Sequence, residues 1–389
     1  MQQSFQRDRF TWLTYMILAF YGYFLNVIGP VTPFLKDELG LSYTVSSLHY
    51  TAFALGILLV GLGGHLVIRR IGRWYSLWLG AAGISLGTLV LIAGRNPWVT
   101  IGAAFVMGLV GSLILAIIPS VLADRHGALR TVAISEANLL TSVVSTAAPF
   151  MVGFFARTVA GWRLSLALVA LVPLVLYVIF RDLRHELPAP GPSAAVEEEK
   201  KPLPALYWAY WTALMLGVAV EFCMISWSAD YLQKAFGMLQ ADAAQSVALF
   251  LGAMIVGRVL VSRLLLRFSS TTLVIASILV AGAGFLLYWL SGSVLFGLAG
   301  LFITGLGVAG LYPLIVSLAI GAAGSQTVQA SARATLASGT AILVLPLVLG
   351  RLADALGIRA AYGVVSVVLV SVFVIILVTR RLAPEVGNA

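Results

Sequence analysis

One acidic residue interrupts an apolar segment that is long enough to cross a lipid bilayer. The stretch VAVEFCMISW occupies residues 218–227, and its Glu221 lies near the middle of a mainly apolar run over residues 206–233. A carboxylate in such a place marks an ion pair, a substrate site or a proton relay. We therefore predict that Glu221 carries protons or contacts a substrate, with a structural bond to a neighbouring helix as the alternative.

Three more charged residues lie within apolar segments, namely Glu136, Arg258 and Arg333. Glu136 and Arg258 lie at similar distances from the ends of their segments, so they share a depth in a membrane. Arg333 follows Glu136 by 197 positions, since 333 minus 136 is 197. Because a long cationic side chain can reach the membrane surface from within a span, Arg333 is expected either to snorkel there or bond locally, or to bind a substrate anion.

Polar and aromatic residues near these charges are the remaining candidates for a binding site. Tyr23 and Asn26 belong to the first apolar segment, where Asn26 either faces a cavity or bonds a neighbouring helix. Trp227 shares the apolar run of Glu221, and Tyr312 precedes a proline in a later apolar segment. We predict that these side chains line a cavity.

The composition places the chain among membrane proteins before any element is positioned. Of its 389 residues, 60% are hydrophobic and only 10% are charged, against about 25% charged residues in soluble domains. The single cysteine excludes a disulfide framework. The sequence has no GxxxxGK[ST], HExxH or CxxC motif, so we expect no ATP, metal or other cofactor. The net charge of +9 indicates basic loops, not a nucleic-acid partner.

Twelve segments have the length and apolarity of membrane-spanning helices. They cover residues 11–35, 45–68, 75–94, 98–122, 131–155, 163–181, 206–233, 244–266, 271–290, 293–320, 327–350 and 360–379. A stretch rich in proline and charge over residues 181–204 separates the first six from the last six. We predict an all-α membrane protein with a six-helix bundle at 1–183, a cytoplasmic linker at 184–204 and a second six-helix bundle at 205–389.

Basic residues indicate the orientation of the chain in the bilayer. With the N-terminus inside, the inner segments hold about twice as many arginine and lysine residues as the outer ones. We therefore expect an integral protein of a prokaryotic cytoplasmic (inner) membrane with both termini in the cytoplasm.

The two halves of the sequence resemble each other at an offset near 197 residues. FLKDELG at 34–40 aligns with YLQKAFG at 231–237, Gly108 aligns with Gly305, and PFMVG at 149–153 aligns with PLVLG at 346–350. Six spans per half give both halves the same orientation, so the repeat is parallel. A parallel repeat predicts a cavity between the halves, near the bilayer midplane.

Twelve spans in two parallel halves with a charged central loop resemble the major facilitator superfamily. The loop after the second span carries a variant of the family signature G-x-x-x-D-R-x-G-R. It reads HLVIRRIGR over residues 65–73, so Arg70 and Arg73 match, whereas Arg69 replaces the aspartate that in the family anchors a cytoplasmic gate. Arg70 and Arg73 are expected either to take part in a gate or to anchor the loop at the membrane surface.

The resemblance also implies a partner for two of the charges. The fifth and eighth spans are neighbours across the interface between the halves of the family fold, so Glu136 and Arg258 are expected to form an interdomain gate. Breaking a desolvated pair of this kind costs about 3–5 kcal/mol. The alternative is that Glu136 faces the cavity and binds substrate.

The family resemblance implies a secondary active transporter that works by alternating access as a monomer and is not an enzyme. VAVEFCMISW is similar to the seventh helix of fucose-permease-like members, which favours a proton-coupled carrier of a small polar solute such as a sugar. Export of an amphipathic or lipophilic compound by proton antiport is the alternative, and an organic anion is a further possible solute. A membrane-embedded receptor or enzyme is the competing class, but the sequence shows no nucleophile-and-base constellation.

Overall fold

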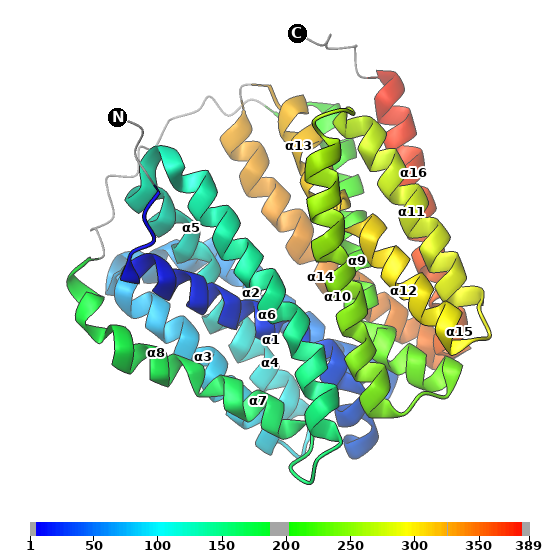
Figure 1. The fold of residues 1–389 in the computed structure, drawn as a ribbon, viewed down its shortest axis with the longest axis horizontal. Helices are drawn as coiled ribbons and strands as arrows, with labels where there is room; N and C mark the ends of the chain where they lie inside the picture. The colour runs from blue at the N-terminus through cyan, green and yellow to red at the C-terminus, as the bar shows by residue number, and fades with distance from the viewer. Residues whose placement is uncertain (1–4, 187–201, 325, 383–389) are drawn as a thin grey trace. The chain divides into compact units, whose positions relative to one another are not determined.

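A computed structural model describes residues 5–186, 202–324 and 326–382 (Figure 1). The described residues form two compact units. Unit 1 comprises the described residues before position 187 except Ser42–Ser47, and unit 2 comprises Ser42–Ser47 and the described residues from position 202 onward. Most of the predicted linker, residues 187–201, lies outside the described residues, so the predicted domain bounds stay a prediction.

Unit 1 is built from helices alone over its described residues. They are α1 (Arg9–Leu39), α2 (Tyr43–Ile71, whose first turn belongs to unit 2), α3 (Arg73–Ala93), α4 (Pro97–Gly111), α5 (Leu113–His126), the short 3-10 helix η1 (Gly127–Leu129), α6 (Arg130–Ala156), α7 (Arg163–Ala170), α8 (Val172–Phe180) and the 3-10 helix η2 (Arg181–Glu186).

The described part of unit 2 is helical as well. Its helices are α9 (Ala205–Phe236), α10 (Gln240–Leu264), α11 (Ser270–Leu290), α12 (Val294–Val308), α13 (Leu311–Ala322), α14 (Thr327–Leu356), α15 (Ile358–Ala361) and α16 (Gly363–Leu382).

The helices account for twelve membrane passes, as the sequence predicts. Among the described residues, eleven helical stretches are long and apolar enough to cross a membrane, and one of them, Pro97–Ala156, has 60 residues. Sixty helical residues rise about 90 Å, which is three times the thickness of the hydrocarbon core. The turn at η1 divides this stretch into one pass made of α4 and α5 and another made of α6.

Three predicted spans are interrupted well inside their length, although continuous helices were expected, and the twelfth is interrupted near its start at Tyr362 between α15 and α16. The fourth breaks at Ser112 between α4 and α5, the sixth at Leu171 between α7 and α8, and the tenth at Ala309 and Gly310 between α12 and α13. In the fourth, sixth and tenth spans the second piece carries a proline, namely Pro119, Pro173 or Pro313. Proline removes a backbone donor and clashes with the preceding turn, which interrupts or bends a helix.

The two units repeat the same glycine contacts 197 positions apart. A Cβ on Gly108 of α4 would lie 2.1 Å from the Phe53 carbonyl oxygen of α2, and one on Gly305 of α12 would lie 2.5 Å from the Phe250 carbonyl oxygen of α10. The differences 305 minus 108 and 250 minus 53 are both 197. The sequence repeat therefore corresponds to equivalent close packing of helices within each unit.

The first helix of each unit ends in the same way, again 197 positions apart. Gly40 follows α1 with φ 62°, and Gly237 follows α9 with φ 68°. Positive φ at this position suits glycine because it has no Cβ. Both helices are buried along most of their length, whereas most other helices expose large apolar side chains such as Leu62, Leu86 and Leu295. α1 and α9 therefore hold polar groups where lipid does not reach.

Candidate functional site

The Glu221 carboxylate of α9 faces the Arg258 guanidinium of α10. Glu221 Oε1 lies 4.0 Å from an Arg258 terminal nitrogen, and the Glu221 side chain is 17% exposed. This separation is longer than a hydrogen bond, which joins nitrogen and oxygen at about 2.7–3.2 Å. Among the described residues, no group donates a hydrogen bond to Glu221. The carboxylate is charge-compensated, and its oxygens are available to a proton or a donor ligand.

Tyr312 lies within electrostatic range of this carboxylate. It belongs to α13, and the Glu221 charge acts on its hydroxyl. Its side chain is 40% exposed, so it is an open member of the cluster. Glu221, Arg258 and Tyr312 come from three helices of unit 2. We refer to these three residues as the Glu221 cluster.

Trp227 has a structural environment in unit 2. Its indole Nε1 donates to the Pro346 carbonyl of α14 at 3.1 Å, and its ring lies 5.7 Å from the ring of Tyr43. The residue is almost completely buried. This hydrogen bond joins α9 to α14. The structure thus ties Trp227 to helix packing.

Arg333 of α14 is held locally by tryptophans of α9. Its guanidinium carbon lies 5.2 Å from the centre of the Trp208 ring, which is a cation–π distance. Trp211 donates from Nε1 to the Arg333 carbonyl at 2.8 Å. These contacts agree with the alternative that Arg333 bonds locally, while the substrate-anion alternative stays a prediction.

Glu136 of α6 is bound by the segment that precedes α1. Arg7 donates to it from Nε at 2.8 Å and from a terminal nitrogen at 2.6 Å, and the Tyr15 hydroxyl donates at 3.3 Å. The hydrogen bond and charge of Glu136 raise the pKa of Arg7. Glu136 and Arg258 thus each have a partner within their own unit, and the predicted gate between them stays a prediction.

Asn26 and Tyr23 of α1 both bond neighbouring helices of unit 1. The Asn26 amide donates to Ser145 Oγ of α6 at 3.2 Å and to the Gly22 carbonyl at 2.9 Å. The buried Tyr23 hydroxyl donates to the Ser165 carbonyl of α7 at 3.2 Å. The structure gives Asn26 the helix–helix bond that was its alternative assignment.

The two signature arginines lie in helices, Arg70 in the last turn of α2 and Arg73 at the start of α3. Arg73 donates to Asp124 of α5 at 2.6 Å, which ties α3 to α5 within unit 1. Arg70 is exposed. Arg73 therefore has a carboxylate partner although Arg69 replaces the aspartate of the family signature.

One acidic residue that the sequence analysis did not single out caps a helix in unit 2. Asp354 of α14 accepts hydrogen bonds from the backbone amides of Tyr43 at 2.7 Å and Thr44 at 2.8 Å. These amides begin α2, where a helix leaves its first donors unpaired and attracts negative charge. The position of Asp354 within GRLADALGIR carries no local capping signal, because the helix it caps begins 311 residues away.

Two buried charges were also missed, Lys36 of α1 and Asp230 of α9. Each lies in the last turns of its helix, where sequence alone suggests exposure at a membrane surface. The apolar residues around Lys36 and Asp230 could have indicated that these charges are buried. Each lies in the first helix of its half, and that helix is the most buried element of its unit.

A family model described as Major Facilitator Superfamily matches residues 14–331. A glucose/galactose transporter of Brucella abortus biovar 1 (strain 9-941) is 27% identical over 398 aligned residues, which cover 90% of this chain and 89% of that protein. A putative metabolite transport protein of Bacillus subtilis (strain 168) is 26% identical over 160 residues, covering 41% of this chain and 35% of that protein.

Solved structures of transporters share the fold. A bacterial homologue of the human lysosomal transporter Spinster, in an inward-facing and occupied conformation, matches with a TM-score of 0.83 at 16% identity, covering 97% of this chain and 98% of that one. A POT family transporter in complex with 5-aminolevulinic acid matches with a TM-score of 0.81 at 14% identity, covering 100% and 99% of the two chains. At these identities the likeness concerns the fold alone.

Proposed function

Because the chain belongs to the major facilitator superfamily, and is thus a membrane transporter and not an enzyme, we propose that it carries a small polar solute by proton-coupled alternating access. The solute class we favour is a sugar. The protein works as a monomer in a prokaryotic inner membrane with both termini in the cytoplasm, and its bundles cover residues 1–183 and 205–389 with a linker at 184–204. The basic residues of the inner segments support this orientation.

The observation that carries the proposal is the open carboxylate of Glu221. It lies on the most buried helix of unit 2, it accepts no hydrogen bond from a described residue, and its cationic neighbour Arg258 is 4.0 Å away. A buried carboxylate that accepts no hydrogen bond from neighbouring residues can change its charge when a proton or a ligand binds. Glu221 therefore has the chemistry of a coupling residue.

The interaction of Glu221 with Arg258 depends on whether Glu221 is protonated. An ionised Glu221 attracts the guanidinium, and a protonated Glu221 releases it. The loose pair thus converts one proton into a change of charge and position between α9 and α10. A change of this kind is what couples proton binding to a movement of helices, because it favours different arrangements in the two protonation states.

A sugar fits the Glu221 cluster because its hydroxyl groups both donate and accept. One hydroxyl can donate to the Glu221 carboxylate while it accepts from Arg258 across the 4.0 Å separation, and the partly exposed Tyr312 offers a further hydroxyl and an apolar ring face. The names of the Brucella relatives, glucose/galactose transporters, support this solute class.

Transport by purified protein in liposomes tests the proposal. With an imposed pH gradient, the wild-type chain is expected to accumulate labelled glucose or galactose, and Glu221→Gln is expected to exchange the sugar across the membrane without accumulating it. Glu38→Gln is the matched control, because this part-exposed carboxylate pairs with Arg163 in unit 1 and is not part of the cluster. Accumulation by Glu221→Gln equal to wild type would remove Glu221 from the coupling role.

The solute is tested separately from the coupling. Sugars, carboxylates, short peptides and lipophilic cations are compared as competitors of uptake. If lipophilic cations compete and sugars do not, the protein is an exporter of amphipathic compounds, which is the alternative function. If peptides or carboxylates compete in place of sugars, the sugar assignment is wrong and the coupling assignment stands.

A further inference from the structure

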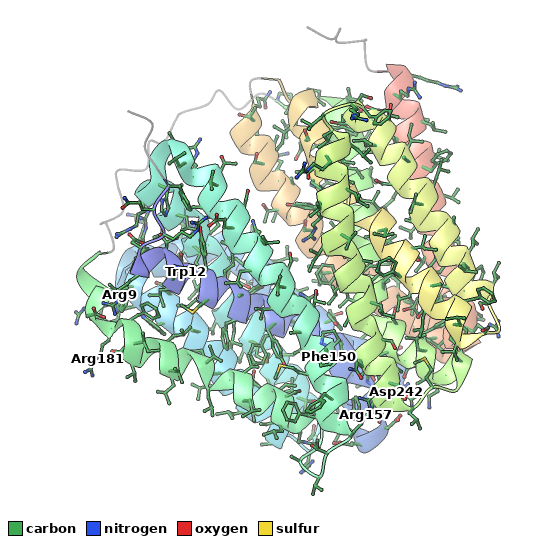
Figure 2. All side chains as sticks on the ribbon, in the orientation of Figure 1. Arg9, Trp12, Phe150, Arg157, Arg181 and Asp242 are labelled. Carbon is green, nitrogen blue, oxygen red and sulfur yellow. The ribbon has the colours of Figure 1, made fainter. Side chains whose placement is uncertain are left out.

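Three consecutive residues before and at the start of α1 pair with three different elements of unit 1. Arg7 pairs with Glu136 of α6, Asp8 pairs with Arg125 of α5, and Arg9 pairs with Asp182 of η2. Figure 2 labels Arg9 and Arg181 at this end of unit 1. We call residues 5–11 the strap.

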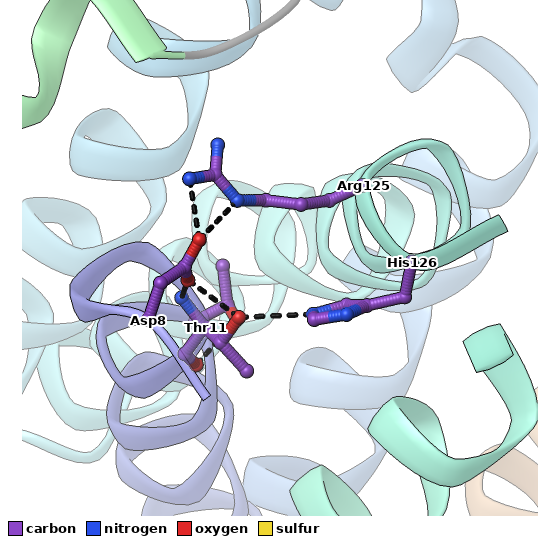
Figure 3. Close-up of polar contacts among 5 residues, drawn as sticks. Asp8, Thr11, Arg125 and His126 are labelled. Carbon is purple, nitrogen blue, oxygen red and sulfur yellow. Dashed lines mark hydrogen bonds and ion pairs between the residues drawn. The ribbon is translucent and has the colours of Figure 1, made fainter. Parts of the chain in front are cut away.

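The centre of the strap is a chain of hydrogen bonds shown in Figure 3. Asp8 accepts from Arg125 Nε at 2.6 Å, from the Thr11 amide at 2.7 Å and from the Thr11 hydroxyl at 2.7 Å. The Thr11 oxygen lies 2.9 Å from His126 Nε2. Since the Thr11 hydroxyl gives its only proton to Asp8, His126 must donate from Nε2. The contact therefore sets the tautomer of the imidazole.

Two aromatic contacts also join the strap to the end of α5. The Phe5 ring lies 4.8 Å from the His126 ring, and the Arg125 guanidinium carbon lies 5.1 Å from the centre of the Phe10 ring. On its other side the last turn of α5 is held by the bond from Arg73 to Asp124. The end of α5 is thus held by charged and polar groups in addition to its buried side chains Val121 and Leu122.

The segment that the strap holds is hinged. α5 is separated from α4 at Ser112, whose hydroxyl bonds back to the Gly108 carbonyl, and Pro119 removes a backbone donor farther along the helix. Both features bend helices and weaken their backbone bonding. At its other end α5 stops at Gly127, which has φ 50°. The position of its last turns therefore depends on side-chain contacts more than on backbone continuity with α4.

We propose that the strap is a releasable restraint on the last turns of α5 and the first turns of α6. Its ion pairs are part-exposed, with side-chain exposures of 47% and 28% for Arg7 and Glu136 and of 26% and 38% for Arg125 and Asp8. Pairs exposed to this extent are screened by salt and are individually weak. Several weak bonds together restrain the last turns of α5 and the first turns of α6, and the restraint is lost when these bonds are screened or removed.

Amide hydrogen exchange on the full-length chain in lipid nanodiscs tests this restraint, and it needs no knowledge of the transported solute. The test variant is Arg7→Gln with Asp8→Asn. Asparagine keeps an oxygen for the Thr11 amide, so the start of α1 stays capped while the charges are lost. Exchange over residues 120–137 is expected to rise about two- to fivefold for each ion pair removed.

The matched control is Arg163→Gln. Arg163 pairs with Glu38 in the same unit with exposures of 26% and 36%, close to those of the Arg125–Asp8 pair, but it acts on α7 and α1 instead of α5. Exchange over residues 120–137 is expected to stay at the wild-type level in this control. A salt series on the wild-type chain, from 0.01 M to 1 M, is expected to reproduce the effect of the test variant.

Three results would overturn the restraint. The first is unchanged exchange over residues 120–137 in the test variant when residues 5–11 themselves exchange faster. The second is an equal rise in the Arg163→Gln control or throughout unit 2, which would mean general destabilisation. The third is salt-independent exchange at the end of α5 in the wild-type chain, and this result decides the matter even if the double variant fails to fold.

Discussion

The Glu221 carboxylate lies 4.0 Å from the Arg258 guanidinium, so α9 and α10 share an ion pair without a hydrogen bond. Such a pair compensates charge without holding two side chains in one geometry. It therefore differs from the Arg7–Glu136 contact of unit 1, where two hydrogen bonds of 2.8 and 2.6 Å fix both groups. The looser pair is the one that a proton or a solute can separate.

A double-mutant cycle on the loose pair tests this difference. Arg258→Gln leaves Glu221 without its cation and is expected to lower thermal stability, whereas adding Glu221→Gln to Arg258→Gln is expected to recover part of the loss. Because neighbouring charges couple, the interaction should reach about 0.5–1 kcal/mol in thermal unfolding of the purified protein. Additive effects of the two substitutions would show that the residues do not interact.

Substitution of Asn26 distinguishes a structural role from a solute-binding role for this residue of unit 1. Asn26→Ala and Ser145→Ala are each expected to lower stability, with a coupling of about 0.6 kcal/mol, which is typical of a hydrogen bond between membrane helices. The apparent solute affinity is expected to stay within twofold of wild type. A large loss of affinity at unchanged stability would place Asn26 against the solute instead.

The glycines of α4 allow a comparison within one helix. Gly108→Ala would bring a Cβ to 2.1 Å from the Phe53 carbonyl oxygen, whereas a Cβ on Gly102 meets nothing within 4 Å. We expect Gly108→Ala to cost about 1–3 kcal/mol in thermal unfolding, since two backbones must move apart. Gly102→Ala should be neutral or slightly stabilising, because alanine favours the helix. Equal effects of the two substitutions would contradict the close packing of α4 on α2.

Asp8 predicts how stability responds to acid. Burial raises the pKa of Asp8, but hydrogen bonds from the Thr11 hydroxyl and amide and from Arg125 more than offset this, so its pKa lies below the usual value of 3.8. A lowered carboxyl pKa contributes stability that is present above the unfolded-state pKa and is lost as the pH falls through the folded-state pKa.

The measurement is the thermal unfolding temperature of wild type and Asp8→Asn between pH 7 and pH 3. The difference between the two is expected to be constant from pH 7 to about pH 5 and to shrink below about pH 4, because protonation of Asp8 removes the same charge as the substitution. A difference that stays constant down to pH 3 would show that the charge of Asp8 contributes nothing to stability.

Local features of the sequence predicted the helices because each helix depends on residues close in the chain. The length of each apolar run indicated the spans, and the structure shows that Gly40 and Gly237, which the repeat aligns, each follow a helix with positive φ. The interruptions at Ser112 and Leu171 were missed. A serine or leucine there carries no strong breaking signal, since the interruption depends on a proline farther along and on neighbouring helices.

The sequence by itself determined that the chain spans a membrane, that it does so twelve times in two related halves, and that Glu221 is its most unusual residue. Apolar length, basic loops and the 197-residue repeat suffice for this because they act along the chain. Only the tertiary structure decided the partners. Arg258 lies beside Glu221, and Arg7 bonds Glu136 although 129 residues separate Arg7 from Glu136 in the chain. Helix packing, not sequence distance, sets which charges meet.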